Sequence, residues 1–101
     1  MNKNDIARKA IESTIDEVKE ILLAKNQAYG NSAYEPVRVF SKADPIEQIN
    51  VRLDDKLSRL FRGEAAGEDV ELDLIGYLIL KRGYSKYREI LNHEELRDSL
   101  G

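Results

Sequence analysis

Apolar residues recur at helical spacing along most of the chain, and no stretch shows the convincing period-two alternation of a half-buried β-strand. The first predicted helix begins near residue 4 or 5 and reaches about residue 28. Its apolar stripe consists of Ile11, Ile15, Val18 and Leu22. Gly30 follows, and glycine readily takes the positive φ that ends many helices. We therefore expect the chain to start with a long amphipathic helix.

A second helix is predicted from Pro45 to Arg62. Asp44 is suited to the N-cap, Pro45 to the first helical position, and Glu47 to the completion of a capping box. Its core stripe consists of Ile46, Ile49, Leu53, Leu57 and Leu60. The preceding residues 30–44 are expected to form an ordered loop. The residues expected to attach this loop to the core are Val37, Val39 and Phe40.

The third helix is predicted from about Glu68, after a turn at residues 63–67. Gly83 either ends this helix or weakens it before the pattern continues to Leu91. Residues 1–4 and 93–101 are expected to fray. The fold class is therefore all-α, a helical bundle of three to four helices in a single domain over residues 1–101.

The segment 69–80 of the third helix is apolar on nearly all sides when its residues are spaced at about 100°. Such a helix is normally central in a bundle or covered by a second chain, so we expect a homo-oligomer that completes the bundle. Asp73 lies inside this apolar segment. A buried unpaired carboxylate is costly, so Asp73 is expected to be protonated, paired with a cation or bound to a metal.

The composition is that of a globular protein, with 42% apolar and 35% charged residues among 101 and a formal charge of −3. This charge argues against non-specific nucleic-acid binding by the fold as a whole. The absence of cysteine excludes disulfides and thiolate metal sites. The longest apolar run, residues 74–80, is too short to span a bilayer. We expect a cytoplasmic protein that does not enter a membrane.

A charged flank accompanies the core stripe of the second helix and consists of Arg52, Asp55, Lys56 and Arg59. One interpretation is a solvated row of ion pairs at i,i+4 spacing, each of which would stabilise the helix by about 0.2 to 0.5 kcal/mol. Another is a phosphate-binding site, because arginine forks match phosphate oxygens and a nearby aspartate holds the guanidinium in place. Lys56 is the member closest to the apolar stripe, so it is also a candidate to neutralise Asp73.

Two pairs of carboxylates occur at helical spacing. Glu17 and Glu20 are separated by three residues in the first helix, and Asp69 and Asp73 by four in the third. If these helices pack together, the four carboxylates could hold Mg²⁺, which prefers oxygen ligands and leaves room for substrate phosphates. The alternatives are ordinary surface acids for the first pair and an ion pair with Lys or Arg for Asp73.

The end of the first helix carries three further candidates. Lys25 points towards the core side, Tyr29 offers an aromatic face for a base, and Asn31 offers an amide that could hydrogen-bond a base edge. The alternative is an ordinary C-terminal cap in which Lys25 interacts with the helix dipole. The chain contains no Walker loop, GxSxG, HExxH or CxxC motif, so P-loop chemistry, serine hydrolysis and zinc chemistry have no support.

Three segments together resemble a known family. They are Lys25-x3-Tyr-Gly, Arg52-Leu-x-Asp-Lys-x2-Arg-Leu and Glu68-Asp-x3-Asp-Leu-Ile-Gly-Tyr. The pattern resembles the phage and bacterial family called nucleotide modification associated domain type one, which is similar to the all-α MazG-type nucleotide pyrophosphatases. The resemblance covers roughly residues 25–80. It implies a helical bundle, an oligomer, a phage or prophage origin and a nucleotide ligand.

The resemblance also implies roles for the carboxylates. In MazG-like enzymes, acidic pairs on two helices hold Mg²⁺, and water attacks a phosphate of a nucleoside triphosphate. Asp16-Glu17-x-x-Glu20 is similar to their E-E-x-x-E, and Asp73 is similar to the aspartate of their E-x-x-D. Val70 stands where that motif has glutamate, so Asp69 or Glu71 would have to substitute.

These features lead to three hypotheses. The first is a Mg²⁺-dependent enzyme that hydrolyses a nucleoside triphosphate to the monophosphate and pyrophosphate. In it, Glu17, Glu20 and Asp73 are catalytic and hold the metal together with Asp69. The residues expected to bind the nucleotide are Lys25, Tyr29, Asn31, Arg52, Asp55, Lys56 and Arg59. The second hypothesis is a non-catalytic protein that sequesters a signalling nucleotide. The third is an interaction module whose third helix docks on a host protein.

Overall fold

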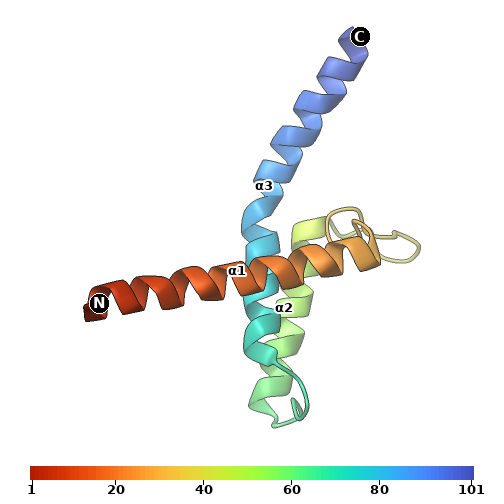
Figure 1. Ribbon diagram of the computed structural model, residues 1–101. Helices are drawn as coiled ribbons and strands as arrows, with labels where there is room; N and C mark the ends of the chain where they lie inside the picture. Colours follow the sequence, from red (N-terminus) through yellow and green to blue (C-terminus); the bar gives the residue numbers. More distant parts are fainter. The chain divides into compact units, whose positions relative to one another are not determined.

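The computed structural model describes all residues from Met1 to Gly101 and contains three α-helices and no strands (Figure 1). The helices are α1 (Lys3–Tyr29), α2 (Pro45–Phe61) and α3 (Val70–Leu100). The chain divides into two compact units, residues 1–32 with α1 and residues 33–101 with α2 and α3. The predicted all-α class is confirmed.

The first unit is essentially helix α1, and its ends follow local rules. The side chain of Asn2 caps the helix by accepting a hydrogen bond from the backbone N–H of Asp5 at 2.9 Å. At the other end, Gly30 has a φ of 63°, a conformation that costs little only for glycine. The helix therefore begins at Lys3 and ends at Tyr29, within about two residues of the prediction.

Helix α2 starts as its sequence predicts. Asp44 Oδ1 accepts a hydrogen bond from the backbone N–H of Glu47 at 2.9 Å, and Pro45 occupies the first turn. The carboxylate of Glu47 accepts a hydrogen bond from the Asn50 amide at 3.2 Å instead of the Asp44 N–H. Only one half of the predicted capping box is therefore formed. The helix ends at Phe61, with Arg62 as its C-cap.

Helix α3 is longer and more regular than the sequence suggests. Asp69 is its N-cap, because its Oδ1 accepts a hydrogen bond from the N–H of Leu72 at 3.0 Å. The helix passes through Gly83 without a break and continues to Leu100. The end expected to fray is helical here, with an ion pair between Arg97 and Glu94 and a Gly101 N–H that reaches the carbonyl of Arg97.

In the second unit, α2 and α3 run antiparallel to each other across the turn at residues 62–69 (Figure 1). The buried apolar side chains of this pair are few, namely Ile49, Leu53 and Val70, together with Pro45. Large apolar side chains remain exposed on both helices, including Phe61 at 83% and Leu78 at 53%. The pair therefore has more apolar surface than it buries within itself.

The loop before α2 is attached to α3 by tyrosines. The Tyr34 hydroxyl donates a hydrogen bond to the Leu80 carbonyl at 2.9 Å, and its ring stacks on Tyr87 with centroids 4.7 Å apart. Tyr84 also contacts the Tyr34 ring, at a centroid distance of 5.6 Å. The Tyr87 hydroxyl donates to Glu35 Oε1 at 2.7 Å. These contacts span more than forty residues of sequence, as the separation of 46 between Tyr34 and Leu80 shows.

The prediction that Val37, Val39 and Phe40 attach this loop is wrong, because their exposed fractions are 81%, 72% and 97%. Polar contacts order the loop instead. The Arg38 guanidinium donates to the Ala43 carbonyl at 2.6 Å, and the Gln48 side chain donates to the same carbonyl at 2.8 Å. These contacts hold the loop directly in front of the first turn of α2.

None of the three helices combines the length and the apolar character that crossing a membrane would need.

The close approach of Tyr34 to Gly83 gives a testable prediction. A Cβ atom added at Gly83 would lie 2.9 Å from the Tyr34 hydroxyl, so Gly83→Ala must displace this group. Alanine also favours a helix interior over glycine by about 1 kcal/mol. We expect this gain in full when the hydroxyl is removed first by Tyr34→Phe, and a clearly smaller gain, or a loss, in the wild-type background.

Urea unfolding of the four proteins in this cycle measures the difference. The same effect of Gly83→Ala in both backgrounds would show that the Tyr34 hydroxyl does not occupy this position.

Candidate functional site

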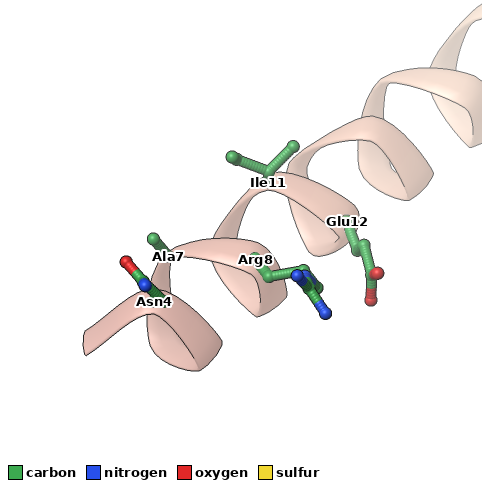
Figure 2. A pocket seen from close by; sticks show the side chains of 5 residues that line it. All are labelled: Asn4, Ala7, Arg8, Ile11 and Glu12. Carbon is green, nitrogen blue, oxygen red and sulfur yellow. The ribbon is translucent and has the colours of Figure 1, made fainter. Parts of the chain in front are cut away.

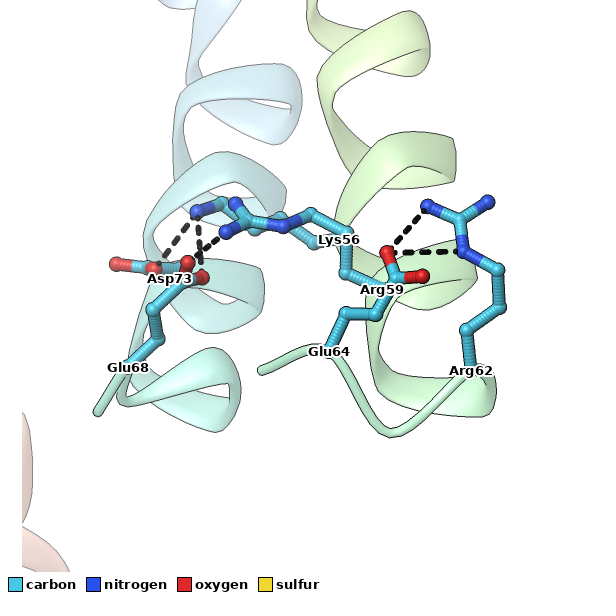
Figure 3. Close-up of polar contacts among 6 residues, drawn as sticks. All are labelled: Lys56, Arg59, Arg62, Glu64, Glu68 and Asp73. Carbon is cyan, nitrogen blue, oxygen red and sulfur yellow. Dashed lines mark hydrogen bonds and ion pairs between the residues drawn. The ribbon is translucent and has the colours of Figure 1, made fainter. Parts of the chain in front are cut away.

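Four charged side chains meet between α2 and the start of α3, and we call them the charge cluster: Lys56, Arg59, Glu68 and Asp73 (Figure 3). Lys56 Nζ lies 3.1 Å from Asp73 Oδ2 and 3.3 Å from Glu68 Oε2. The Arg59 guanidinium contacts the other carboxylate oxygen of Glu68. One ammonium therefore joins two carboxylates, and Glu68 in turn joins both cations.

Helix geometry brings these groups together. Lys56 follows the buried Leu53 by three residues, so it projects from the side of α2 that faces α3. Asp73 lies one turn after the N-cap residue Asp69, and Glu68 directly precedes that residue. The exposed fractions of the four side chains range from 17% for Lys56 to 31% for Arg59. The charge cluster is thus largely shielded but still reachable from solvent.

The cluster is electrostatically balanced, with two cations and two carboxylates. The pKa of Lys56 is raised above its usual value, mainly by the hydrogen bond to Asp73, with Glu68 adding to the effect and burial opposing it. Lys56 therefore remains an ammonium at neutral pH. A second ion pair, Arg62 with Glu64 at 3.1 Å, lies at the end of α2 and involves none of the cluster residues (Figure 3).

The structure selects among the alternatives left open for these residues. Lys56 does neutralise Asp73, as one of the alternatives predicted. Arg59 pairs with Glu68 and not with Asp55 at i,i+4. Arg52 and Asp55 are exposed on α2 and belong to no ion pair. Of the predicted charged flank, only Lys56 and Arg59 take part in the charge cluster.

The other predicted site residues lie elsewhere. Asp69 is exposed, and one of its oxygens is used as the N-cap of α3. The remaining candidates belong to the first unit, on α1 or directly after it, and all have exposed side chains: Glu17, Glu20, Lys25, Tyr29 and Asn31. Tyr29 is 73% exposed. Its ring has room for a stacking partner.

Glu68 is the cluster residue that the sequence analysis did not assign. It contacts Lys56 and Arg59 across the turn, at separations of 12 and 9 residues. Helical periodicity does not predict these contacts, because Glu68 lies before the start of α3. The one available signal is its place directly before an N-capping aspartate, where a carboxylate lies near a helix N-terminus.

No group of three or more aspartate, glutamate, histidine or cysteine side chains is gathered as a metal site. Glu68 and Asp73 form the one carboxylate pair that shares a contact, through Lys56. Mg²⁺ is commonly held by one or two carboxylates, with water and substrate phosphates completing its shell. The donor set of the cluster fits this mode of binding and does not fit a cage made of protein ligands alone.

A surface hollow on the first unit carries no comparable chemistry. It is lined by Asn4, Ala7, Arg8, Ile11 and Glu12, all from the first turns of α1 (Figure 2). All five side chains are exposed, and they point away from a single helix and not towards a common point. The charge cluster is therefore the stronger candidate site.

No family model, curated protein or solved structure matches this chain. The functional argument therefore depends on the residues themselves.

The contribution of Lys56 to stability can be measured with Lys56→Met, which keeps an apolar stem and removes the ammonium. The substitution leaves Asp73 and Glu68 without their shared cation, so we expect a loss of about 1 kcal/mol in the free energy of unfolding. Lys81→Met is the matched control, because Lys81 is exposed on α3 and forms no ion pair. An equal effect of both substitutions in urea unfolding would contradict a role for the cluster.

The pH dependence of this effect follows from the raised pKa of Lys56. A group with a higher pKa in the folded state stabilises the fold fully below its unfolded value, here 10.5, and the stabilisation is lost as pH rises through the folded pKa. The difference in unfolding free energy between wild type and Lys56→Met should therefore decline only above that pH. If this difference in unfolding free energy already declined between neutral pH and pH 9, about one unit or more below 10.5, the result would contradict a raised pKa of Lys56.

Proposed function

We propose that this protein binds a nucleotide and, with Mg²⁺, hydrolyses a nucleoside triphosphate to the monophosphate and pyrophosphate. The observation that supports this proposal is the charge cluster. It gathers two cations suited to phosphate oxygens and two carboxylates suited to a divalent metal, and it keeps all four reachable from solvent. The resemblance of residues 25–80 to nucleotide-handling proteins supports the same proposal.

The proposed binding step is an exchange of partners within the cluster. Without ligand, Lys56 and Arg59 are held by Glu68 and Asp73. A metal–triphosphate complex brings both a cation and several anionic oxygens. Lys56 and Arg59 would then bind the phosphate oxygens, and Glu68 and Asp73 would be the carboxylates that hold the metal. Each charge keeps an opposite partner throughout, so the exchange avoids the cost of an unpaired, shielded charge.

The remaining proposed roles come from the sequence. Asp69, at the start of α3, would add a carboxylate to those of Glu68 and Asp73, and the metal-binding roles of Glu17 and Glu20 in the first unit stay a prediction. Arg52 and Asp55 would border the phosphate site, and nucleotide contacts by Lys25, Tyr29 and Asn31 of the first unit stay a prediction. Bound Mg²⁺ would supply an activated water and offset the charge that develops on the phosphate. Attack of the water oxygen on the α-phosphorus would form one P–O bond and break the bond from that phosphorus to the α–β bridging oxygen. Pyrophosphate would leave with the bridging oxygen, and a proton of the water would pass to solvent.

A second candidate is nucleotide binding without turnover, and one observation favours it. Lys56 already satisfies Asp73 at 3.1 Å, so this carboxylate needs no metal in order to be stable. Val70 also leaves the predicted metal motif without one of its acids. A protein that uses Lys56 and Arg59 for phosphate, and keeps its carboxylates as their counter-ions, would sequester a nucleotide and release it unchanged.

We also propose that the protein is a homo-oligomer and that it acts in the cytoplasm. The support for the oligomer is the exposed apolar surface of α2 and α3, which includes Val51, Phe61, Leu78 and Ile79. These four side chains are 47% to 83% exposed, and large exposed apolar patches commonly mark surfaces that a partner covers.

The test combines turnover with binding. The purified protein is incubated with a panel of nucleoside triphosphates and cyclic nucleotides, with and without Mg²⁺, while pyrophosphate release and the thermal unfolding midpoint are measured. We expect Mg²⁺-dependent pyrophosphate release that falls about 100-fold in Asp73→Asn, the upper end of the loss found when groups that support a metal site are replaced. Asp54→Asn is the matched control, since Asp54 is exposed on α2 outside the cluster.

The other outcomes separate the candidates. Stabilisation by a nucleotide without pyrophosphate release supports the non-catalytic binder. In that case Lys56→Met abolishes the stabilisation and Lys81→Met keeps it. No response to any nucleotide contradicts both candidates and leaves a function in protein–protein interaction.

A further inference from the structure

The two carboxylates of the charge cluster are held by different parts of the backbone. Asp73 lies within α3, where its N–H donates a hydrogen bond to the Asp69 carbonyl at 3.0 Å. Glu68 lies before the helix, and its N–H donates to the Ala65 carbonyl at 3.1 Å, within the turn. Asp73 therefore moves only with the helix, whereas the position of Glu68 depends on the conformation of the turn.

The turn that carries Glu68, residues 62–69, is loosely packed around its two glycines. Gly63 and Gly67 have φ values of 71° and 81°, which side chains other than hydrogen rarely allow. A Cβ atom added at either glycine would meet no other atom within 4 Å, so the space around both is open. A segment with few packing contacts opens at a lower free energy than the helices that flank it. Glu68 can therefore leave the cluster without the unfolding of α2 or α3.

Glu68 contacts the two cations in the way that a phosphate group would. One of its carboxylate oxygens accepts a hydrogen bond from Lys56 Nζ at 3.3 Å, and the other accepts one from the Arg59 guanidinium (Figure 3). A carboxylate and a phosphate group both present pairs of oxygens on one central atom, and the arginine fork matches either. The side chain of Glu68 thus occupies the place where the proposed phosphate group would meet Lys56 and Arg59.

The charge balance of the cluster depends on Glu68. When Glu68 leaves, Lys56 keeps its contact with Asp73 at 3.1 Å, but Arg59 loses its ion-pair partner. A shielded guanidinium without a partner is costly, so another anion must replace the carboxylate. An ammonium has several donors, which allows Lys56 to hold Asp73 and an incoming oxygen together. The cluster without Glu68 has two cations and one carboxylate, and it therefore attracts an anionic group.

We infer that Glu68 is an internal competitor of the ligand: it occupies Lys56 and Arg59 in the ligand-free protein, and a phosphate group must displace it in order to bind. This inference takes the identity of the anion from the proposed function. It adds that Glu68 leaves while Asp73 stays, and that the time Glu68 spends on the two cations lowers the affinity of the site. Once displaced, the Glu68 carboxylate is free for the metal of the proposed reaction.

The inference has a consequence with a distinctive sign. Removal of the Glu68 charge strengthens the binding of a phosphate group even when no metal is present. A residue that served only as a metal ligand would have no such effect without metal, and a residue that served only to hold the fold together would weaken binding when replaced. The affinity of the site is therefore regulated by the turn at residues 62–69.

Isothermal titration calorimetry with inorganic pyrophosphate, in the presence of a chelator and at constant ionic strength, tests the inference. We expect Glu68→Gln to bind pyrophosphate at least about fivefold more tightly than the wild type, because a partly exposed charged competitor has been removed. Arg59→Met added to Glu68→Gln removes this gain. Glu64→Gln is the matched control, since Glu64 lies in the same turn, pairs with Arg62 and loses the same charge. We expect its affinity to stay within about twofold of the wild-type value.

A second measurement uses the wild-type chain and does not depend on the folding of a variant. The side-chain carboxyl carbons are followed by NMR while pyrophosphate is added without metal. We expect the signal of Glu68 to change until the site is saturated, because its carboxylate exchanges the Arg59 guanidinium for water. The signal of Glu64, whose partner Arg62 lies outside the cluster, stays in place.

Three results would each overturn the inference. They are a pyrophosphate affinity of Glu68→Gln equal to or below that of the wild type, an equal gain in Glu64→Gln, and a Glu68 signal that is unchanged at saturation. If the wild type responds to a nucleotide with Mg²⁺ but Glu68→Gln shows no gain, the inference fails and the proposed function stands. If Glu68→Gln shows the gain but no variant responds to any nucleotide, the proposed function fails and the internal competitor stands.

Discussion

The shared contact of Lys56 with Asp73 and Glu68 is the constraint on which the second unit depends. The buried apolar side chains of α2 and α3 are few, and they include Ile49, Leu53 and Val70. A core of this size gives limited preference for one register of the two helices over another. A single ammonium that must reach one carboxylate within α3 and another just before it provides that preference, because a shift by one turn would separate them.

The same contact explains how the chain tolerates a carboxylate in an apolar helix. Asp73 is neutralised by a cation of the neighbouring helix, and the partly exposed site reduces the cost of removing both groups from water. This arrangement satisfies a structural need and at the same time gathers side chains of the types that bind phosphates and divalent metals in proteins. The proposed nucleotide site is therefore an alternative pairing of charges that the fold already requires, and it adds no unpaired charge to the ligand-free protein.

Local features were predictable from the sequence, and contacts across turns were not. Asp44 and Pro45 start α2 through interactions within four residues, so the local sequence was sufficient to predict where this helix begins. Lys56 was recognised as a possible partner of Asp73 because both lie on apolar faces. Glu68 was missed, since its position depends on the path of the turn that precedes α3.

The attachment of the loop before α2 was predicted from hydrophobicity and assigned to Val37, Val39 and Phe40. In the structure Tyr34 attaches the loop, through a hydrogen bond to the backbone carbonyl of Leu80 on α3. The helical end of α3 was also underestimated, because continuous helix propensity outweighs the single Gly83.

The most direct test of this account is a double-mutant cycle between Lys56→Met and Asp73→Asn, measured by urea unfolding. The account predicts that the two substitutions are not additive, with a coupling free energy of about 1 kcal/mol, because either one alone removes the same ion pair. Additive effects within about 0.3 kcal/mol would contradict it, since they would mean that Lys56 and Asp73 stabilise the protein independently.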